Sequence, residues 1–397
     1  MSAQQGKGNP ARKDRVSAGT AYQKHQSFSA FQSPARDLGG VVARLRRFAA
    51  APESRPADAY RRAILGRALR DLLEPPTGEG PRFELHPNVL EELARLEDQE
   101  FARYLFYRYR YEVFPQTREL DAYPPCLQVE PTSSCNYRCV FCYQTDSEFT
   151  GRQQGHMGTM ALDLFQKLVD EAQGHVEALT LASRGEPTVA KELPAMLRYL
   201  TGKFLAAKIN TNASLLTEKL CHAILETGLQ TVVFSADAAA EPLYSELRVN
   251  GSLERVLERV RLFHDIRAKH YPKSRTITRV SGVQVSSSQS MESMTELWGD
   301  LVDQVAFVKY NPWENTYERP LSGEDRPCSD LWRRMFVWWD GRANPCDVDY
   351  KSLLSVGRAG TGGLPALWRS EAYEKLRSAH AGGRRAEVHP CQRCTVV

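Results

Sequence analysis

Strand-like and helix-like patterns alternate through the middle of the chain. Apolar, β-branched runs recur from Pro124 onward, and between them apolar residues fall at three- and four-residue spacing, as in 161–172 and 252–267. The runs are CLQVEPT (126–132), VEALTLAS (176–183), FLAAKINTN (204–212), TVVFSAD (231–237), TITRVSGVQVS (276–286) and QVAFVKYN (304–311). This βα alternation predicts an α/β protein with a parallel sheet, open or curved into part of a barrel. Chemistry in such sheets gathers at the carboxyl ends of the strands.

The flanking segments follow different patterns. Apolar residues repeat every three or four positions over 38–111, which predicts helices. The first 35 residues are rich in Ser, Gln, Gly and Ala without periodicity, which predicts disorder. After Pro320 the pattern is short and irregular, with a hairpin-like segment at 336–345 that contains Asp-Gly. We therefore predict a disordered arm (1–35), a helical N-terminal domain (36–120), a barrel domain (121–318) and a small C-terminal α+β domain (319–397).

Composition and charge narrow the function classes. The 397 residues are 42% hydrophobic and 25% charged, as in ordinary globular proteins. No apolar run is long enough to span a bilayer, and the N-terminus lacks the apolar stretch of a secretory signal. We therefore expect a cytoplasmic protein without a membrane partner. The net charge of +4 is slight and concentrated in the first 36 residues, which favours a solvated arm over a nucleic-acid surface.

Nine cysteines are the most informative residues. Disulfides are rare in the cytosol, so clustered thiols indicate metal binding or catalysis. Seven of the nine fall into close sets: Cys135, Cys139 and Cys142, then Cys328 and Cys346, then Cys391 and Cys394. Cys126 and Cys221 stand alone, one at the start of a strand and the other within a predicted helix, where a thiol packs as a small apolar group.

The first set, Cys135-x3-Cys139-x2-Cys142, lies in the loop directly after the first predicted strand. Three thiolates can hold three irons of a [4Fe–4S] cluster and leave the fourth iron open to a ligand. A structural zinc site, the alternative, normally has four protein ligands, most often as two CxxC pairs. The second set, Cys328, Cys346, Cys391 and Cys394, offers four thiolates and thus a closed site. Its spacing alone does not choose between zinc and a fully ligated [4Fe–4S] cluster.

The segment CNYRCVFC (135–142) resembles the CxxxCxΦC motif of the radical S-adenosylmethionine (radical SAM) superfamily, where Φ is aromatic. The resemblance implies a partial (β/α)6 TIM barrel, a [4Fe–4S] cluster on the first cysteine set, and S-adenosylmethionine bound to its open iron. SRGEP (183–187) stands where the family has its GGE motif, which grips the methionine amino group, with Arg184 replacing the first glycine. The cosubstrate contacts implied in this way are Phe141, Ser183, Gly185, Glu186, Asn210, Asn212, Ser235, Asp237 and Arg248. Capping of turns or helices is the alternative role for Ser235 and the two asparagines.

The second cysteine set resembles the auxiliary-cluster extension of the same superfamily. Its full form, called SPASM, begins C-x9–15-G-x4-C, and here 12 residues separate Cys328 from Gly341. Only one CxxC follows, as in the shorter Twitch domain, which holds a single auxiliary [4Fe–4S] cluster. Single-auxiliary-cluster relatives include 2-deoxy-scyllo-inosamine dehydrogenase, an aminocyclitol enzyme whose Cx17C and CxxC spacing this chain shares. The resemblance covers residues from about 124 to 397 and leaves the N-terminal helices unexplained.

The resemblance also implies a reaction. One electron from a donor such as flavodoxin or ferredoxin cleaves S-adenosylmethionine to a 5′-deoxyadenosyl radical, which takes a hydrogen atom from an unactivated carbon. If the substrate electron then passes to the auxiliary cluster, a carbinol becomes a ketone; if a thiol quenches the radical, the carbon is epimerised. Because neither lone cysteine is placed as a hydrogen donor, we predict a radical SAM dehydrogenase acting on a sugar or aminocyclitol-type substrate. A peptide (RiPP) maturase and a radical epimerase are the alternatives, although maturases often carry a three-stranded leader-binding sheet.

The loop after the last predicted strand, KYNPWENTYERP (309–320), leads from the barrel to the C-terminal domain. It is therefore expected to line the space between the two clusters and to contact substrate. We predict Glu314 as a base for the hydroxyl proton and Tyr317 as a further catalytic contact, with Arg279 on the fifth strand orienting the substrate. The alternative for each is an ordinary linker or surface-pairing role.

Overall fold

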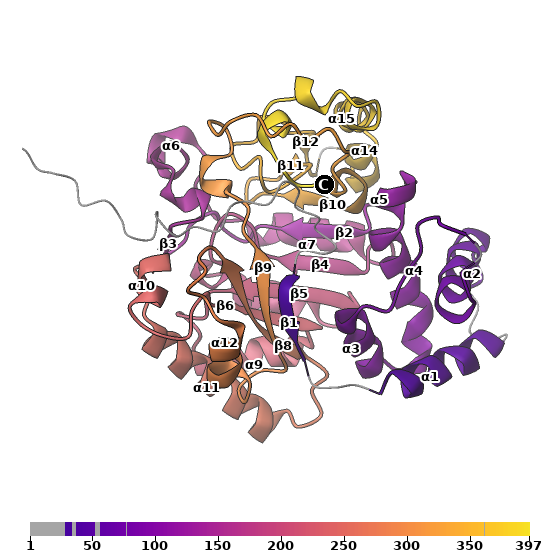
Figure 1. Ribbon diagram of the computed structural model, residues 1–397, viewed down its shortest axis with the longest axis horizontal. Coiled ribbons are helices and arrows are strands. Elements are labelled where there is room, and N and C mark those ends of the chain that lie inside the picture. Colours follow the sequence, from indigo (N-terminus) through magenta and orange to yellow (C-terminus); the bar gives the residue numbers. More distant parts are fainter. Residues whose placement is uncertain (1–27, 34–36, 52–55, 77, 361) are drawn as a thin grey trace, which may run out of the picture.

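The computed structural model describes residues 28–33, 37–51, 56–76, 78–360 and 362–397, which form an α/β structure around one mixed sheet (Figure 1). Six strands of this sheet are parallel neighbours and follow the predicted runs. They are β2 (Cys126–Val129), β4 (Ala178–Leu181), β5 (Ala206–Thr211), β6 (Thr231–Ser235), β8 (Ile277–Gln284) and β9 (Gln304–Lys309). This arrangement confirms the α/β class and fits a partial barrel.

Helices separate successive parallel strands and cover the outer face of the sheet (Figure 1). They are α7 (Leu162–Ala172), α8 (Leu193–Leu200), α9 (Glu218–Thr227), α11 (Leu253–His270) and α12 (Met291–Trp298), with the short helices α6 (Ser147–Thr150) and α10 (Leu243–Leu247) in loops. Side chains alternate along each strand, so Ala207 and Ile209 of β5 join the apolar core under the helices. Lys208 and Asn210 therefore face the barrel interior.

The N-terminal helices pack against the amino ends of the strands. They are α1 (Leu38–Ala50), α2 (Ala59–Leu73), α3 (Pro87–Arg95), α4 (Phe101–Glu112) and α5 (Phe114–Thr117). Their apolar faces form one buried cluster that also contains Cys126, Ala178 and Ala206, the first residues of β2, β4 and β5. The helical pattern predicted for this region is confirmed, and the helices close the amino end of the barrel.

Strand β1 (Phe28–Gln32) corrects part of the prediction for the first 35 residues. We expected disorder there, but residues 28–32 pair antiparallel with β9 and extend the sheet by one strand. An edge strand such as β9 presents unpaired N–H and C=O groups, and β1 satisfies them. The rest of the predicted arm, 1–27 and 34–35, lies outside the described residues.

The C-terminal region extends the sheet at its other edge. Strand β10 (Arg334–Val337) runs parallel to β2, and β11 (Arg342–Asn344) and β12 (Gly357–Arg358) follow in antiparallel order. The predicted hairpin is confirmed, and Gly341 in its turn has a φ of +83°. Helices α13 (Asp330–Arg333), α14 (Leu364–Trp368) and α15 (Glu371–Ala381) complete the unit, which lies above the barrel in Figure 1.

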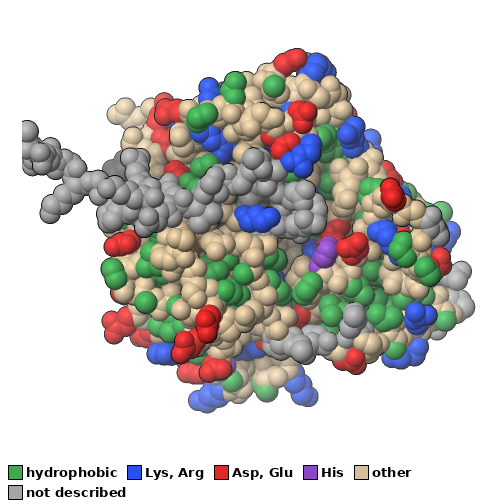
Figure 2. Space-filling model, viewed as in Figure 1, with side chains coloured by type: hydrophobic (Ala, Val, Ile, Leu, Met, Phe, Trp, Pro, Cys, Tyr) green, Lys and Arg blue, Asp and Glu red, His purple; other side chains and the backbone are tan. Residues whose placement is uncertain are grey.

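The surface is mixed in charge. On the face shown in Figure 2, basic and acidic side chains of the described residues are interspersed. Within the described part of the chain, no helix combines the length and apolar character needed to cross a membrane.

Candidate functional site

The first cysteine set lies in a pocket of about 200 Å³ at the carboxyl ends of β4, β5 and β6. The strand ends supply the other walls, as expected for a parallel sheet. Of the residues predicted from sequence, this pocket brings together Cys135, Cys139, Cys142, Phe141, Ser183, Gly185, Glu186, Asn210, Asn212, Ser235 and Arg248. Tyr137, Thr211 and Val283 also line it but were not predicted; Tyr137 lies within the CNYRCVFC motif.

Gly185 allows the cysteine loop to approach the end of β4. A Cβ at this position would lie 2.3 Å from the carbonyl oxygen of Thr132 and 2.5 Å from that of Ser134. The neighbouring amide of Glu186 donates a 2.9 Å hydrogen bond to the same Ser134 carbonyl. Only glycine therefore fits here, and the contact fixes the backbone immediately before Cys135.

The Glu186 carboxylate, which is 4% exposed, joins the loops after β4 and β5. It accepts hydrogen bonds from the Thr188 amide (3.0 Å) and hydroxyl (2.6 Å), from the Thr211 hydroxyl (2.6 Å) and from the Asn212 amide (2.7 Å). These bonds make Glu186 a positioning residue for the pocket wall. Its contact with a methionine amino group remains a prediction.

A buried ion pair lies behind Cys139. Asp237, fully buried, pairs with Arg248 at 2.5 Å and accepts a 2.6 Å hydrogen bond from the Val283 amide. The Arg248 guanidinium in turn donates to the Cys139 sulfur at 3.8 Å. Asp237 is not among the residues that line the pocket, and its predicted contact with the cosubstrate stays a prediction. A buried arginine needs a counter-charge, and Asp237 supplies it.

The thiols of the first set favour the protonated form when no metal is bound. Burial raises the pKa of Cys135 to about 12 and that of Cys139 to about 11, while Arg248 opposes the second shift. Metal binding would therefore displace these protons. Among the described residues, no three His, Cys, Asp or Glu side chains converge as they would around a single metal ion. A cubane does not require such convergence, because each thiolate binds a different iron.

Several buried polar atoms on the pocket wall have no hydrogen-bond partner among the described residues. Ser183 Oγ, after β4, and Asn210 Oδ1, on β5, are buried without a hydrogen bond to any described residue. Buried polar atoms are nearly always satisfied, so a polar ligand in this pocket would complete them. Together with three adjacent thiols, these atoms fit a [4Fe–4S] cluster and the polar groups of S-adenosylmethionine.

Arg184, the departure from the family's glycine, makes a buried ion pair. Its guanidinium contacts both oxygens of Glu130, at 2.6 and 2.7 Å, and donates to the Tyr350 carbonyl at 2.9 Å. It also lies 4.3 Å from the ring centre of Trp338. Glu130 accepts a further 3.2 Å hydrogen bond from the Trp339 amide. Arg184 therefore joins the barrel to the C-terminal region.

The second cysteine set comes together in the C-terminal region. Burial raises the pKa of Cys328 to about 12, and Cys346 and Cys391 shift in the same direction, partly because each thiol lies near others of the set. The CxxC turn is held by Arg385, which is fully buried and donates to the carbonyls of Cys391 (3.2 Å) and Cys394 (2.7 Å). The four cysteines thus lie in one partly buried region of the C-terminal unit, two of them on a turn that Arg385 holds.

Trp313 links the two cysteine sets. It lines the pocket of the first set and also packs in the apolar cluster that contains Cys328, Cys346 and Cys394. This tryptophan belongs to the 309–320 loop that we predicted to lie between the clusters.

The three predicted catalytic residues do not line this pocket. The Tyr317 hydroxyl donates to Asp349 at 2.8 Å and accepts from the Lys351 amide at 2.7 Å, and Glu314 accepts a hydrogen bond from Tyr310. Arg279 lies in a separate cavity near the amino ends of the strands. Strand alternation correctly directs Arg279 into the barrel, but its position early in β8 places it at the wrong end. The structure does not bring these three residues together at the cysteine pocket, and their catalytic roles stay predictions.

Comparison with known proteins identifies two domains. Residues 129–280 match the Radical SAM superfamily, and residues 328–395 match SPASM, an iron–sulfur cluster-binding domain. The chain is 34% identical over 113 residues to the tungsten-containing aldehyde ferredoxin oxidoreductase cofactor-modifying protein of Pyrococcus furiosus (28% of this chain, 30% of that protein). It is 28% identical over 137 residues to the mycofactocin maturase of Mycobacterium tuberculosis (34% and 33%). The chain spans about a third of the length of these curated relatives.

Solved structures show weaker likeness. BtrN in complex with AdoMet and 2-DOIA superposes with a TM-score of 0.47 at 17% identity, covering 68% of this chain and 93% of BtrN. SuiB of Streptococcus suis bound to S-adenosylmethionine gives a TM-score of 0.49 at 14% identity, covering 73% and 76% of the two chains.

Proposed function

We propose that this protein, a radical SAM enzyme with a C-terminal SPASM-type iron–sulfur cluster-binding domain, oxidises a carbinol of a hydroxylated small molecule to a ketone. The observation that carries the proposal is the position of Trp313, which lines the pocket of the first cysteine set and packs against the apolar cluster that contains Cys394 of the second. A substrate near this tryptophan would lie between the site where a hydrogen atom is removed and a site able to accept an electron.

The two domains imply a [4Fe–4S] cluster with S-adenosylmethionine and an auxiliary iron–sulfur centre. When bound, the first cluster and S-adenosylmethionine would supply the 5′-deoxyadenosyl radical that takes hydrogen from the carbinol carbon, and the second would take up the remaining electron. Cys135, Cys139 and Cys142 would hold the first cluster. Cys328, Cys346, Cys391 and Cys394 would hold the second.

Residues of the pocket would bind and orient the cosubstrate. Ser183 and Asn210 each present an unsatisfied buried oxygen, and Asn212 and Ser235 lie on the same wall. Glu186 and Gly185 hold the loops that carry these side chains. The Arg248 guanidinium beside Cys139 favours the thiolate form of that ligand. The hydroxyl proton of the substrate would leave to solvent or to a nearby base.

A sugar or aminocyclitol is the proposed substrate class, and flavodoxin or ferredoxin the proposed donor. Peptide maturases often bind a leader peptide on a three-stranded sheet. In the described part of residues 28–117 we find five α-helices and one strand, β1, which pairs with the barrel strand β9. This architecture favours a small substrate over a peptide.

The test measures iron and product together. The anaerobically reconstituted full chain is incubated with S-adenosylmethionine, a reductant and a panel of deuterated aminocyclitols and sugars, while 5′-deoxyadenosine and ketone are quantified by mass spectrometry. We expect about eight irons per chain, deuterium in 5′-deoxyadenosine and one ketone per cleaved cosubstrate. The Cys391→Ala, Cys394→Ala double variant should retain about four irons and S-adenosylmethionine cleavage but lose ketone. Cys221→Ala is the matched control.

Other outcomes would overturn the proposal in distinct ways. Ketone formation that survives in the double variant would remove the electron-acceptor role of the second site. Exchange of the substrate hydrogen with solvent deuterium without ketone would indicate epimerisation. Turnover of a peptide, with no small molecule accepted, would indicate a maturase.

A further inference from the structure

The barrel interior contains a second polar cavity, of about 180 Å³, at the end opposite the cysteine pocket. The inner faces of the same strands line both spaces. On β5, Lys208 lines the second cavity and Asn210 lines the cysteine pocket. On β6, Thr231 lines the second cavity and Ser235 lines the cysteine pocket. Lys208 and Asn210 are two residues apart on one strand face, about 7 Å along the strand. The two cavities therefore lie on opposite sides of a thin layer of inward side chains.

Cationic side chains predominate in this second cavity. Four of them line it, from four different elements: Arg108 of α4, Lys208 of β5, Arg279 of β8 and Arg334 of β10. Two carboxylates also line it. Glu112 pairs with Arg108 at 2.9 Å, and Glu92 accepts a 2.6 Å hydrogen bond from the Tyr104 hydroxyl. The lining side chains therefore carry more positive than negative charge.

Lys208 has no partner that explains its burial. Its ammonium group forms no hydrogen bond or ion pair with any described residue. Burial, together with the nearby guanidiniums of Arg334 and Arg279, lowers the pKa of Lys208 to about 8. Arg279 donates to Gln304 at 2.6 Å and lies over the rings of Phe28 and Phe31, which are neutral partners. Arg334 lies 3.7 Å from the buried Asp330 carboxylate, whereas Lys208 has no carboxylate within ion-pair distance among the described residues. Cations grouped away from solvent are costly unless an anion accompanies them.

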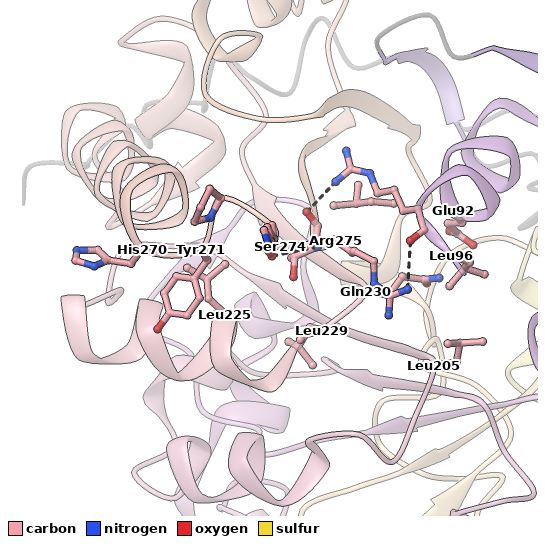
Figure 3. Close-up of a pocket in the computed structure, with 16 residues that line it drawn as sticks. Glu92, Leu96, Leu205, Leu225, Leu229, Gln230, His270, Tyr271, Ser274 and Arg275 are labelled. Atoms are coloured by element: carbon pink, nitrogen blue, oxygen red, sulfur yellow. Dashed lines mark hydrogen bonds between the residues drawn. The ribbon is translucent and has the colours of Figure 1, made fainter. Parts of the chain in front are cut away.

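A larger cavity, of about 480 Å³, adjoins this polar one and shares Glu92 and Gln230 with it. Figure 3 shows Glu92 and Leu96 on one side of the larger cavity and His270 and Tyr271 on the other, with Gln230 between them. The Gln230 Nε2 atom is buried and has no hydrogen-bond partner among the described residues. This donor lies where the two cavities meet, so a ligand entering from the larger cavity would pass it.

We propose that the polar cavity binds a small oxyanion, a carboxylate or a phosphate group, between Lys208, Arg279 and Arg334. The ligand reaches it through the larger cavity beside helix α3. Guanidinium and ammonium groups both form charge-assisted hydrogen bonds to such oxygens. The N-terminal helices then have a role in this protein, since α3 and α4 form the wall that closes the site.

The experiment measures oxyanion binding to the reconstituted full chain. Inorganic phosphate and succinate are titrated at constant ionic strength, with chloride as reference, and followed by calorimetry and thermal unfolding. We expect at least one of the two to bind and to raise the Tm. Lys208→Met and Arg279→Met should each weaken that binding by about tenfold or more. Lys203→Met, at a lysine paired with surface Asp170, should bind as wild type does.

Binding of phosphate alone would identify the ligand group as a phosphate, and binding of succinate alone would identify it as a carboxylate. Either result supports the proposed site. A second readout does not depend on a ligand. Without added anion at pH 7, where Lys208 is mainly protonated, Lys208→Met should be at least as stable as wild type, because it removes a cation from among arginines. Absence of binding by both anions to wild type, or undiminished binding in a folded Lys208→Met or Arg279→Met variant, would overturn the proposal. These results are independent of the C-terminal cysteines and therefore of the proposed oxidation.

Discussion

Replacing Arg184 by methionine tests the role of the buried ion pair at the junction of barrel and C-terminal region. Glu130 is fully buried and Arg184 is 3% exposed. Methionine keeps the length and apolar bulk of the side chain, so its packing on Trp338 is largely retained. What is lost is the guanidinium, with its contacts to both Glu130 oxygens and to the Tyr350 carbonyl.

The magnitude follows from the charge that remains. In the variant the Glu130 carboxylate keeps only two main-chain donors, the amides of Arg184 (3.1 Å) and Trp339 (3.2 Å). Removing one partner of a buried pair typically costs about 3–5 kcal/mol, because the other charge is left uncompensated. Adding Glu130→Gln removes that charge while its amide oxygen still accepts from a main-chain donor. We therefore expect the free energy of unfolding of the double variant to be only about 1–3 kcal/mol below that of wild type.

The assay is urea unfolding of the reduced apo-protein, followed by tryptophan fluorescence. Two of the six tryptophans, Trp338 and Trp339, lie at the affected junction. Lys375→Met, which removes an exposed ion pair with Glu371 one helical turn away, is the control and should unfold as wild type does.

Two results would refute this reasoning. If the free energy of unfolding of Arg184→Met were less than about 1 kcal/mol below that of wild type, the buried pair would contribute no more than a surface ion pair. A double variant as unstable as Arg184→Met would mean that packing, rather than the unpaired carboxylate, determines the cost.

Three further predictions concern single positions. Gly185→Ala places a methyl group 2.3 Å from a carbonyl oxygen and should prevent assembly of the first cluster, measured as iron per chain. Gly66→Ala is the control: its methyl group meets nothing within 4 Å, so this variant should keep full iron. Equal iron in both variants would contradict the expectation. Asp237→Asn should lower the free energy of unfolding by about 3 kcal/mol, because Arg248 loses its counter-charge; an unchanged urea midpoint would disprove this. The pKa of Lys208 is lowered to about 8, so on raising the pH the folded form releases this proton before the unfolded chain does. The free energy of unfolding of wild type, compared with that of Lys208→Met, should therefore rise by up to about 3 kcal/mol between pH 8 and 10.5. A pH-independent difference between the two unfolding curves would exclude the shift.

Local pattern was sufficient to predict the barrel and most of the cysteine pocket. Each strand run is short and apolar and is bounded by polar or turn residues, as is typical of a buried strand, and carboxyl ends of parallel strands meet at one edge. Residues at the carboxyl end of a strand, such as Asn210 and Ser235, could therefore be placed together.

Interactions that depend on distant pairing could not be predicted. The partners Glu130 and Arg184 are 54 positions apart, and nothing in either segment indicates the other. Asp237 follows its strand as a cosubstrate contact would, but the path of the chain after β6 turns it toward Arg248. Alternation predicted that Arg279 faces inward, but not that the cavity there is separate from the cysteine pocket. Strand β1 was missed because FSAFQ is short and lies among polar residues.

The alternation of β5, with Ala207 and Ile209 outward and Lys208 and Asn210 inward, has an evolutionary consequence. The large apolar core lies outside the sheet, beneath the helices. Apart from Ala178 and Ala206, which pack with the N-terminal helices, the inward side chains of β4, β5 and β6 that line the two cavities therefore contribute little to stability. Inward positions can therefore be exchanged with modest thermodynamic penalty, whereas outward ones cannot. A scaffold divided in this way can acquire new ligand specificities at either mouth while its folding determinants stay unchanged, and directed evolution of this enzyme should begin with the inward positions.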